Sequence, residues 1–389
     1  MKILMIAPEP FFEPRGTPFS EYFRIKALSA LGHTVDLVTY PFGVDKEIPG
    51  LTIFRCGKLP WIRSVRTGPS SAKLGLDLFL FLKVLRQLWR KDYDLIHTHE
   101  EASFIGVLCQ KMTKIPHLYD MHSSLVQQME NFNFTRSKII VRLFKFIETV
   151  SLQNAAAVIV ICRTLFDYAA GITSADKLTL IENFMDDRAG IEEEEKLRQV
   201  RNEINPDGKK IIMYTGTLEA YQGIPLLLDS LSLLGDDFRL VLIGGKEAQV
   251  AKLRRRILEM NLEKRAMVLG QKRSRDIPYY LHAASVLVSP RILGTNIPLK
   301  IYSYLASGVP VVATDLLTHT QSINRDIAIL AAAEATPFAA AIRLAVGPHG
   351  QVVARRALDH CRQHYSSKRY IELVAKALGQ AVPPASIRQ

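Results

Sequence analysis

The sequence is poor in cysteine and has no long uninterrupted apolar run. Its four cysteines are scattered, without a CxxC pair or a histidine-rich neighbourhood. That spacing argues against a disulfide framework and a structural zinc site, and it fits a reducing compartment. The opening residues MKILMIAPEP form too short an apolar run for a signal peptide, and no uncharged run reaches the roughly 18 residues of a transmembrane helix. We therefore expect a cytoplasmic protein.

The sequence also lacks the motifs that identify a phosphate or metal site directly. It contains no Gly-x-Gly-x-x-Gly dinucleotide fingerprint and no Walker loop. No Asp-x-Asp follows a predicted strand, where it would hold a divalent metal against a diphosphate. The pairs Asp186–Asp187 and Asp236–Asp237 flank predicted helices, and we interpret them as caps or solvated carboxylates. We expect no metal and no resident cofactor.

Acidic residues are outnumbered by basic ones. The 389 residues include 50 Lys and Arg against 38 Asp and Glu, a formal net charge of +12 at pH 7. Both halves of the chain share the excess, which argues against a basic tail that binds nucleic acid. A positive protein favours anionic partners such as nucleotides or anionic lipid.

Short β-rich runs alternate with helical segments along the chain. KILMIAP, TVDLVTY, DLIHTH and PHLYDMH precede a charged segment, and KIIMYTG, FRLVLIGG and SVLVSPR follow it. Val- and Ile-rich runs separated by helices indicate parallel sheets covered on both faces, so we expect an α/β fold of two doubly wound units. The predicted boundaries are 1–185 for the first domain, 186–208 for a linker with a solvated helix, 209–350 for the second domain, and 351–389 for the final helices.

The segment GTNIPLKIYSYLASG predicts a tight turn followed by a helix. Gly294 and Asn296 suit the turn, and Pro298 suits a first helical position. Lys300 would then be a cation at the positive end of a helix, where it opposes the macrodipole. Backbone N–H groups and the Lys300 ammonium would together bind a phosphate. The alternative is a capped helix whose lysine extends into water.

Two more strand-end loops carry candidate site residues. Gly16, in PRGTPF after the first strand, would let the backbone approach a ligand, with Thr17 as a helix cap. An ordinary turn is the alternative there. His97, His99 and His122 lie at or near strand ends.

Nearby Glu100, Glu101 and Asp120 could complete a metal site with these histidines. Neighbouring side chains on a strand point to opposite faces, so we do not favour that site. We interpret His97 as a hydrogen-bonded core residue. His122 is the better candidate for contact with a substrate hydroxyl or phosphate.

Two predicted helices combine bulky apolar residues with basic ones. They are SAKLGLDLFLFLKVLRQLWRK and SKIIVRLFKFIETV. Such helices can lie on an anionic membrane surface, which would make the protein peripheral at the inner face of the membrane. They can equally cover a sheet while their lysines extend into water, and we favour that interpretation.

The motifs DLIHTHEEASFIGVL, PHLYDMHSS, IIMYTGTLEAYQGIPLLLDSL, VLIGG and PLKIYSYLASGVPVVATD occur in this order. Together they resemble retaining GT-B glycosyltransferases of family four, the group 1 type. The resemblance implies two Rossmann-like domains facing a cleft, with residues 351–389 crossing back to the first domain. It implies metal-independent transfer of a hexose, with retention, from a UDP- or GDP-sugar to a hydroxyl. The implied acceptor is a glycan or lipid-linked glycan in cell-envelope polysaccharide synthesis.

The resemblance also implies roles for individual residues. His122 matches the histidine that contacts the donor sugar and is the first candidate for catalysis. His99 and Glu100 would lie on the acceptor side. The remaining implied residues bind the donor: Gly16, Thr17, Thr217, Glu219, Gln222, Lys272, Arg273, Arg291, Gly294, Thr295, Asn296, Leu299, Lys300 and Ser303.

The match is incomplete around the donor. The family usually has an acidic pair where this chain has Thr295 and Ser303, and a basic pair where it has Thr217 and Gln222. Each lost charge-assisted hydrogen bond is typically worth about 1.5–3 kcal/mol. We hypothesise that Lys300 supplies the missing charge neutralisation. Two alternatives stay open: a nucleotide-sugar 2-epimerase, which would need paired acid and base carboxylates, and a degenerate, non-catalytic scaffold subunit.

Overall fold

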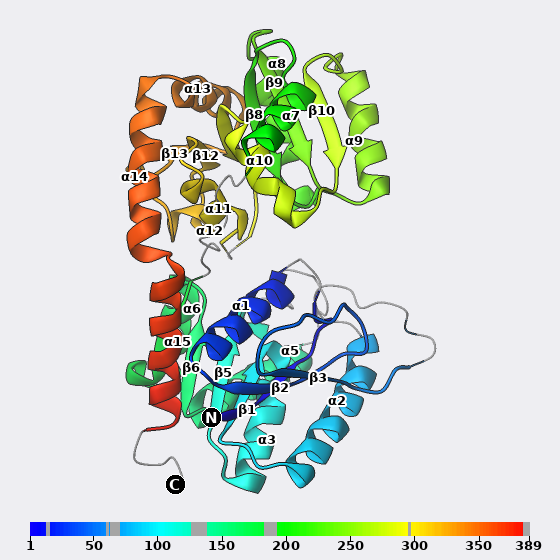
Figure 1. Ribbon diagram of the computed structural model, residues 1–389, viewed down its shortest axis with the longest axis vertical. Helices are drawn as coiled ribbons and strands as arrows, with labels where there is room; N and C mark the ends of the chain where they lie inside the picture. The colour runs from blue at the N-terminus through cyan, green and yellow to red at the C-terminus, as the bar shows by residue number, and fades with distance from the viewer. Residues whose placement is uncertain are drawn as a thin grey trace. The chain divides into compact units, whose positions relative to one another are not determined.

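The computed structural model describes residues 1–12, 16–59, 62, 71–125, 138–182, 193–294 and 297–383. The chain forms two compact units (Figure 1). The first comprises Met1–Asn183 and Lys368–Gln389, and the second comprises Phe184–Ser367. Each unit is an α/β layer structure around one parallel sheet, so the expected fold class of two doubly wound units is confirmed.

The first unit is built on a seven-stranded sheet with the order β3-β2-β1-β4-β5-β6-β7. Neighbouring strands are parallel, and in register Ile3 of β1 lies between Val35 of β2 and Leu95 of β4. Helices cover the sheet, so its central strands are buried along almost their whole length. The strands are β1 (Lys2–Ala7), β2 (Thr34–Thr39), β3 (Leu51–Arg55), β4 (Leu95–His99), β5 (His117–Met121), β6 (Ala157–Val160) and β7 (Leu178–Leu180).

The helices of the first unit fill the connections between these strands. Leu76 and Leu80 of α2 and Cys109 of α3 share one apolar cluster with Leu4 and Ile6 of β1. Since α3 also packs against α5, these three helices lie on one face of the sheet. The helices are α1 (Gly16–Ala30), α2 (Ser71–Arg90), η1 (Glu100–Ala102), α3 (Ser103–Thr113), α5 (Lys138–Asn154), α6 (Arg163–Ala170), η2 (Ala175–Lys177) and α15 (Ser367–Ala381).

The second unit is built on a six-stranded parallel sheet with the order β10-β9-β8-β11-β12-β13. Its strands are β8 (Lys210–Thr215), β9 (Phe238–Ile243), β10 (Ala266–Gly270), β11 (Val286–Ser289), β12 (Val311–Thr314) and β13 (Ile329–Ala331). Its helices are α7 (Glu194–Ile204), η3 (Ala220–Gln222), α8 (Ile224–Ser232), α9 (Glu247–Glu259), η4 (Ser274–Asp276), α10 (Ile277–His282), α11 (Lys300–Ala306), α12 (Leu317–Thr320), α13 (Ala335–Ala345) and α14 (Pro348–His364).

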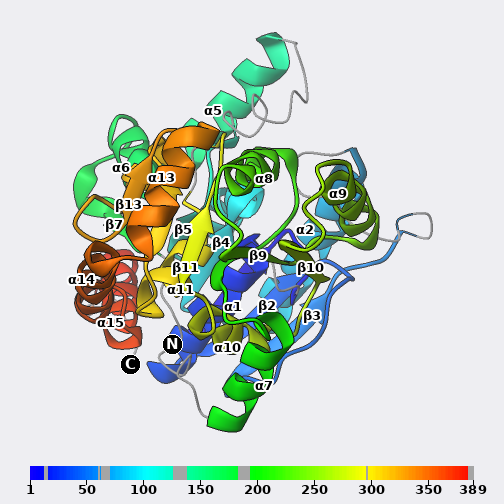
Figure 2. The ribbon, with the colours of Figure 1, turned by 90° about the horizontal axis from the view of Figure 1, so that it is seen from above.

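Two apolar clusters cover the two faces of the second sheet. One contains side chains of α8, α9 and α13, and the other contains side chains of α7, α10, α11 and α14. Figure 2 shows α8 and α9 on one side of the strands and α7 and α10 on the other. The alternation of strands and helices along the sequence therefore produces a sheet that is buried on both faces.

The observed units differ from the predicted boundaries at two places. Val200 and Ile204 of α7 are buried in the core of the second unit, so this helix belongs to that unit and not to a solvated linker. Its charged residues conceal the apolar stripe in the sequence. The predicted final segment 351–389 is not one part. The helix α14 belongs to the second unit, whereas residues from Lys368 onward belong to the first. Within the described residues, no helix is both long enough and apolar enough to cross a membrane.

Candidate functional site

The strand order reverses at one point in each sheet. The reversal lies between β1 and β4 in the first unit and between β8 and β11 in the second. At such a point the connections leave in opposite directions and open a crevice at the carboxyl ends of the strands. Most of the predicted site residues follow these four strands. The two crevices are therefore the places where the predicted residues can meet.

In the second unit, the ammonium group of Lys300 lies against the loop that follows β8. Its Nζ donates to Gln222 Oε1 at 3.3 Å and lies 3.7 Å from the centre of the Tyr214 ring. Among the described residues, no carboxylate lies within ion-pair distance of Lys300. Burial, followed by repulsion from Arg291, lowers the pKa of Lys300 well below its usual range. An anion bound here would favour the charged form of Lys300, since the described residues supply no counter-charge.

Arg291 adds a second cation to this corner. Its Nη1 donates to Thr318 Oγ1 at 2.9 Å, and its guanidinium lies 4.9 Å from the centre of the Tyr221 ring. Gly294 packs against the same guanidinium. The nearby His319 is neutral, because burial, with Arg291 and Lys300 adding to it, lowers its pKa to about 4. His319 therefore adds no charge to this corner, and Lys300 and Arg291 are its basic side chains.

Glycines allow the loops to come this close. Gly223 has φ +72°, and a Cβ there would lie 1.9 Å from the carbonyl oxygen of Pro290. A Cβ on Gly216 would lie 3.2 Å from Lys300 Nζ. Because neither position carries a side chain, the loop after β8 lies directly against the end of β11 and leaves backbone near the two cations.

The predicted residues Thr217 and Gln222 are linked to Lys300. Gln222 accepts from Lys300 through Oε1 and donates through Nε2 to Thr217 Oγ1 at 3.4 Å. The ammonium group therefore contacts the position where the resemblance expects a basic side chain. Glu219, in the same loop, accepts from Gln249 at 3.0 Å.

Several other predicted donor residues are not joined to this corner. Lys272 forms an ion pair with Glu203 at 2.9 Å, and exposed Arg273 follows β10 at the far edge of the sheet. Leu299 directly precedes α11, and Ser303 is half-buried within it. The helix begins at Lys300, two residues later than the predicted start at Pro298. Thr295 and Asn296 lie outside the described residues.

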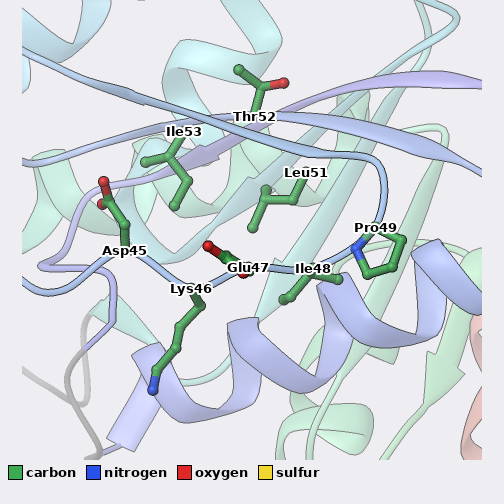
Figure 3. Close-up of a pocket in the computed structure, with 8 residues that line it drawn as sticks. All are labelled: Asp45, Lys46, Glu47, Ile48, Pro49, Leu51, Thr52 and Ile53. Atoms are coloured by element: carbon green, nitrogen blue, oxygen red, sulfur yellow. The ribbon is translucent and has the colours of Figure 1, made fainter.

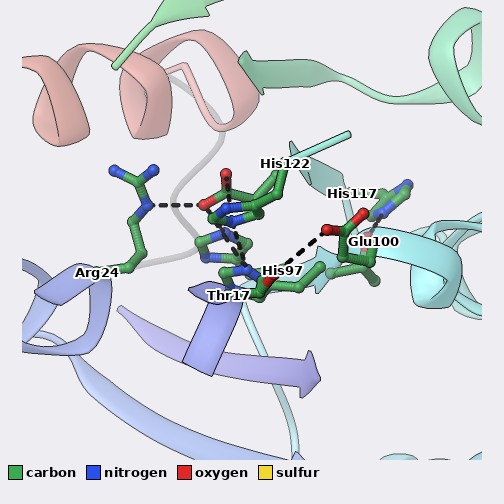
Figure 4. A network of polar contacts seen from close by, with 9 residues as sticks. Thr17, Arg24, His97, Glu100, His117 and His122 are labelled. Carbon is green, nitrogen blue, oxygen red and sulfur yellow. Dashed lines mark hydrogen bonds and ion pairs between the residues drawn. The ribbon is translucent and has the colours of Figure 1, made fainter. Parts of the chain in front are cut away.

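In the first unit, a buried ion pair lies at the centre of the crevice residues. Arg24 Nε donates to Asp120 Oδ2 at 2.7 Å, and the two side chains are 2% and 0% exposed (Figure 4). Asp120 Oδ2 also lies 3.5 Å from His97 Nε2, and its Oδ1 lies 3.2 Å from His122 Nε2. His99 Nδ1 lies 3.2 Å from the same His122 atom.

The expectation that strand alternation separates these groups is wrong. His97 and His99 are two residues apart, so they point to the same face of β4, and their rings stack with centres 4.9 Å apart. Asp120 lies on the neighbouring strand in register with His99. The ligand atoms of His97, His99 and Asp120 lie within 4.8 Å of one another, as a metal site requires. Arg24 already neutralises Asp120, so the charge of this set is balanced by the chain itself.

The burial of this cluster sets its protonation. Burial alone would raise the pKa of Asp120, but Arg24 and His122 hold it well below its usual range. Burial lowers the pKa of His97, and it lowers that of His99 further. Asp120 is thus ionised, whereas His97 and His99 are neutral.

Glu100 brings the loops after β1 and β4 together. It accepts from Ser123 Oγ at 2.8 Å and from Thr17 Oγ1 at 3.4 Å. Thr17 is the second residue of α1, so its predicted role as a cap is wrong, and Gly16 begins that helix. Burial raises the pKa of Glu100 to about 8, and it does the same for Glu21. Both carboxyl groups are largely protonated at pH 7.

Two members of this cluster, Arg24 and Tyr370, are not among the predicted site residues. Arg24 and Asp120 were not identified as a pair, and Tyr370 of α15 lies with its ring centre 5.1 Å from Arg24 Cζ. A signal for Arg24 was present, because it lies between apolar Phe23 and Ile25 in a predicted helix. Nothing in the local sequence indicated its partners.

A hollow of about 670 Å³ lies in the first unit away from these residues (Figure 3). It contains none of the predicted site residues and borders β3 at the edge of the sheet, so we do not assign the site to it. It is lined by Asp45, Lys46, Glu47, Ile48, Pro49, Leu51, Thr52 and Ile53.

The raised pKa of Glu100 predicts a pH-dependent stability. The unfolded carboxyl loses its proton near its ordinary pKa of 4.5, whereas the folded one keeps it until about pH 8. This contribution to stability is complete below pH 4.5 and is lost as the pH rises through 8. Glu100→Gln should therefore reduce the fall in unfolding free energy between pH 7 and 8 by about 1 kcal/mol per pH unit.

Chemical denaturation at several pH values in that window measures the slope, because histidines contribute little above pH 7. Glu247→Gln, at an exposed position on α9, is the matched control and should leave the slope unchanged. Equal slopes for wild type and Glu100→Gln would contradict a protonated Glu100.

Comparison with known proteins gives a consistent result. Residues 24–188 match the model described as Glycosyltransferase Family 4, and residues 209–346 match the model described as Glycosyl transferases group 1. No curated protein sequence matches the chain.

The structure is similar to several solved structures along almost its whole length. HepE of Anabaena, solved with UDP, has a TM-score of 0.77 and 17% identity over 97% of this chain and 100% of its own. Sucrose-phosphate synthase of Thermosynechococcus elongatus has a TM-score of 0.78 and 20% identity. The match covers 97% of this chain and 98% of the synthase chain. WaaG, a glycosyltransferase involved in lipopolysaccharide biosynthesis, has a TM-score of 0.72 and 12% identity. The match covers 98% of this chain and 100% of WaaG. The two family matches and the fold together support a GT-B glycosyltransferase.

Proposed function

We propose that the protein transfers a hexosyl group from a nucleoside-diphosphate sugar to a hydroxyl of a glycan or lipid-linked glycan. The nucleotide is UDP or GDP, the anomeric configuration is retained, and no metal ion takes part. The observation that carries this proposal is the pair of cations, Lys300 and Arg291, at the strand reversal of the second unit. HepE has been solved with UDP and with UDP-glucose, which are ligands of the proposed class.

The cation pair suits a diphosphate leaving group. Negative charge develops on the diphosphate as the bond to the sugar breaks, and fixed cations in a dry corner stabilise it without reorganisation. In the unliganded protein the Lys300 ammonium is destabilised by burial and by Arg291. A bound diphosphate would compensate both charges. Lys300 would thus perform the neutralisation that Thr217 and Gln222 cannot.

The crevice of the first unit suits the reacting sugar and the acceptor. We assign His122 to the donor sugar, and His99 and Glu100 to the acceptor side. The buried neighbours of His122 supply one ionised group, Asp120, and neutral rings. Glu100 keeps its proton at neutral pH, so it can donate a hydrogen bond to an incoming hydroxyl.

A donor screen with product detection tests the proposal. The full-length protein is incubated with labelled UDP- and GDP-hexoses and a panel of glycan and lipid-linked acceptors, with and without EDTA. We expect labelled product with the anomeric configuration of the donor, at an equal rate in EDTA. An isomerised sugar nucleotide without transfer would support the epimerase alternative, and nucleotide binding without any turnover would support the scaffold. Either result would overturn the proposed reaction.

Lys300→Met should raise the Kd for the nucleoside diphosphate at least about tenfold, because the variant lacks the ammonium that would face the phosphates. Titration calorimetry with UDP and GDP measures this change. Lys252→Met removes an exposed lysine of α9 and serves as the control for net charge, so its Kd should equal that of wild type. An unchanged Kd in Lys300→Met would remove Lys300 from the site.

A lipid-linked acceptor is supported by an apolar–basic face on the first unit. The helices α2, α3 and α5 lie on one face of the sheet, and the stripe Leu78, Leu82 and Trp89 of α2 is exposed opposite the residues that pack on the sheet. No described acidic side chain on these helices is exposed. The face comprises the exposed residues Leu78, Phe79, Leu82, Arg86, Trp89, Arg90, Leu108, Lys111, Met112, Lys114, Ile139, Ile140, Arg142, Leu143, Lys145 and Phe146.

We propose that this apolar–basic face lies on the anionic inner surface of a membrane. Ten of the nineteen large hydrophobic side chains exposed in the described chain belong to it, which is more than scattered surface residues account for. Apolar side chains flanked by lysine and arginine insert at the headgroup boundary of anionic lipid. On α2 the residues Leu76 and Leu80 pack on the sheet, as we expect for a covering helix, and the exposed stripe lies on its other side.

Binding to vesicles tests this face. The double variant Leu82→Glu, Phe146→Glu should bind vesicles containing phosphatidylglycerol at least about tenfold more weakly than wild type at low salt, because it places charge in the apolar stripes. Leu258→Glu is the matched control, since Leu258 is 60% exposed on the basic helix α9 of the second unit. Sedimentation with vesicles measures binding. An equal loss in both variants, or no binding by wild type, would contradict the membrane face.

A further inference from the structure

Four side chains form a continuous line from the C-terminal helix to His122. Tyr370 of α15 covers Arg24, Arg24 holds Asp120, and Asp120 contacts His122 (Figure 4 labels Arg24 and His122). We infer that Tyr370, Arg24 and Asp120 are positioning residues that fix the ring of His122 and the nitrogen that carries its proton. This inference rests on the proposed role of His122 at the donor sugar.

The ion pair in this line is poorly explained by stability alone. Arg24 and Asp120 are both removed from water, and a buried pair of this kind is often no more stable than apolar residues of similar volume. It does, however, fix the position of a fully buried carboxylate. Oδ2 of Asp120 accepts from Arg24, and Oδ1 lies beside Nε2 of His122. The two carboxylate oxygens therefore face different side chains.

The geometry also assigns the proton of His122. Its Nε2 lies 3.2 Å from Asp120 Oδ1 and 3.2 Å from His99 Nδ1. An ionised carboxylate only accepts, so a lone pair on Nε2 would be repelled by it. Nε2 therefore carries a proton directed at Oδ1. Asp120 thus keeps Nε2 protonated and holds the ring at the end of β5.

Tyr370 completes the enclosure of Arg24 from a distant part of the sequence. The Nη1 of Arg24 has no hydrogen-bond partner among the described residues, and the ring of Tyr370 lies over the guanidinium with its centre 5.1 Å from Cζ. The helix α15 has separate anchors, because Gln380 contacts Thr179 Oγ1 at 2.6 Å and donates to the carbonyl oxygen of Asp176 at 2.7 Å. Removal of the ring thus leaves the helix docked.

The first test compares two buried aspartates by steady-state kinetics. Asp120→Asn should lower kcat at least about tenfold with the KM for the donor unchanged within about twofold, because we assign the diphosphate to the second unit. Asp36→Asn is the matched control. Asp36 is buried in the same sheet and is paired with Lys91 and Tyr93 at 2.8 Å each. It should lose comparable thermal stability and keep its kcat.

The second test separates the ring of Tyr370 from its hydroxyl. Tyr370→Phe keeps the ring over Arg24 and should keep kcat, whereas Tyr370→Leu should lower kcat at least about threefold at constant KM. The circular dichroism spectrum verifies that α15 stays folded in both. If Asp120→Asn and Tyr370→Leu both keep the wild-type kcat, or lose affinity for the donor only, the positioning role is overturned.

A third measurement does not depend on turnover. Imidazole ¹⁵N spectra of histidine-labelled protein, with His122 assigned by its absence in His122→Ala, report the protonated nitrogen. We expect a protonated Nε2 in wild type and its loss in Asp120→Asn. A wild-type ring protonated on Nδ1 alone would overturn the inference even in an active enzyme. The expected spectrum in a protein that transfers no sugar would overturn the proposed function alone.

Discussion

Each unit depends on a reversal of strand order within a parallel sheet. Connections leave β1 and β4, or β8 and β11, in opposite directions, so polar loops meet at the strand ends. The two crevices handle buried charge differently. In the first, Arg24 and Asp120 neutralise each other. In the second, Lys300 has no described carboxylate partner and lies near Arg291. This difference is the basis of our proposal that the first binds neutral hydroxyl groups and the second an anion.

The fold was largely predictable because its strands are buried on both faces. Runs such as KILMIAP and FRLVLIGG are apolar at nearly every position, and they correspond to β1 and β9. The helix α7 shows the limit of this signal. Its Val200 and Ile204 pack into the second core, but charged neighbours dominate the segment and suggested a solvated linker. Whether a narrow apolar stripe on a helix is buried depends on the element that packs against it. The composition of the helix does not indicate that element.

The site was predictable only where a residue conflicted with its local surroundings. Lys300 stands at the wrong end of a helix, and that conflict identified it. Its contact with Gln222 spans 78 residues and depends on loops that meet in space. The pairing of Arg24 with Asp120 spans 96 residues in the same way. His97 and His99 lie on one face of β4, because residues two apart on a strand share a face. Alternation separates only adjacent residues, so it does not separate these two.

The first unit is interrupted in sequence by the whole second unit. Its last helix, α15, supplies Tyr370 to the Arg24–Asp120 pair. In the sequence, the whole second unit lies between Asp120 and Tyr370. During synthesis the ribosome reaches α15 only after residues 184–367 have emerged. The second unit can therefore complete its core while the first still lacks a helix. The first unit is thus the first to be synthesised and the last to be completed. A chain that ends before α15 would contain His122 but would lack Tyr370 over Arg24.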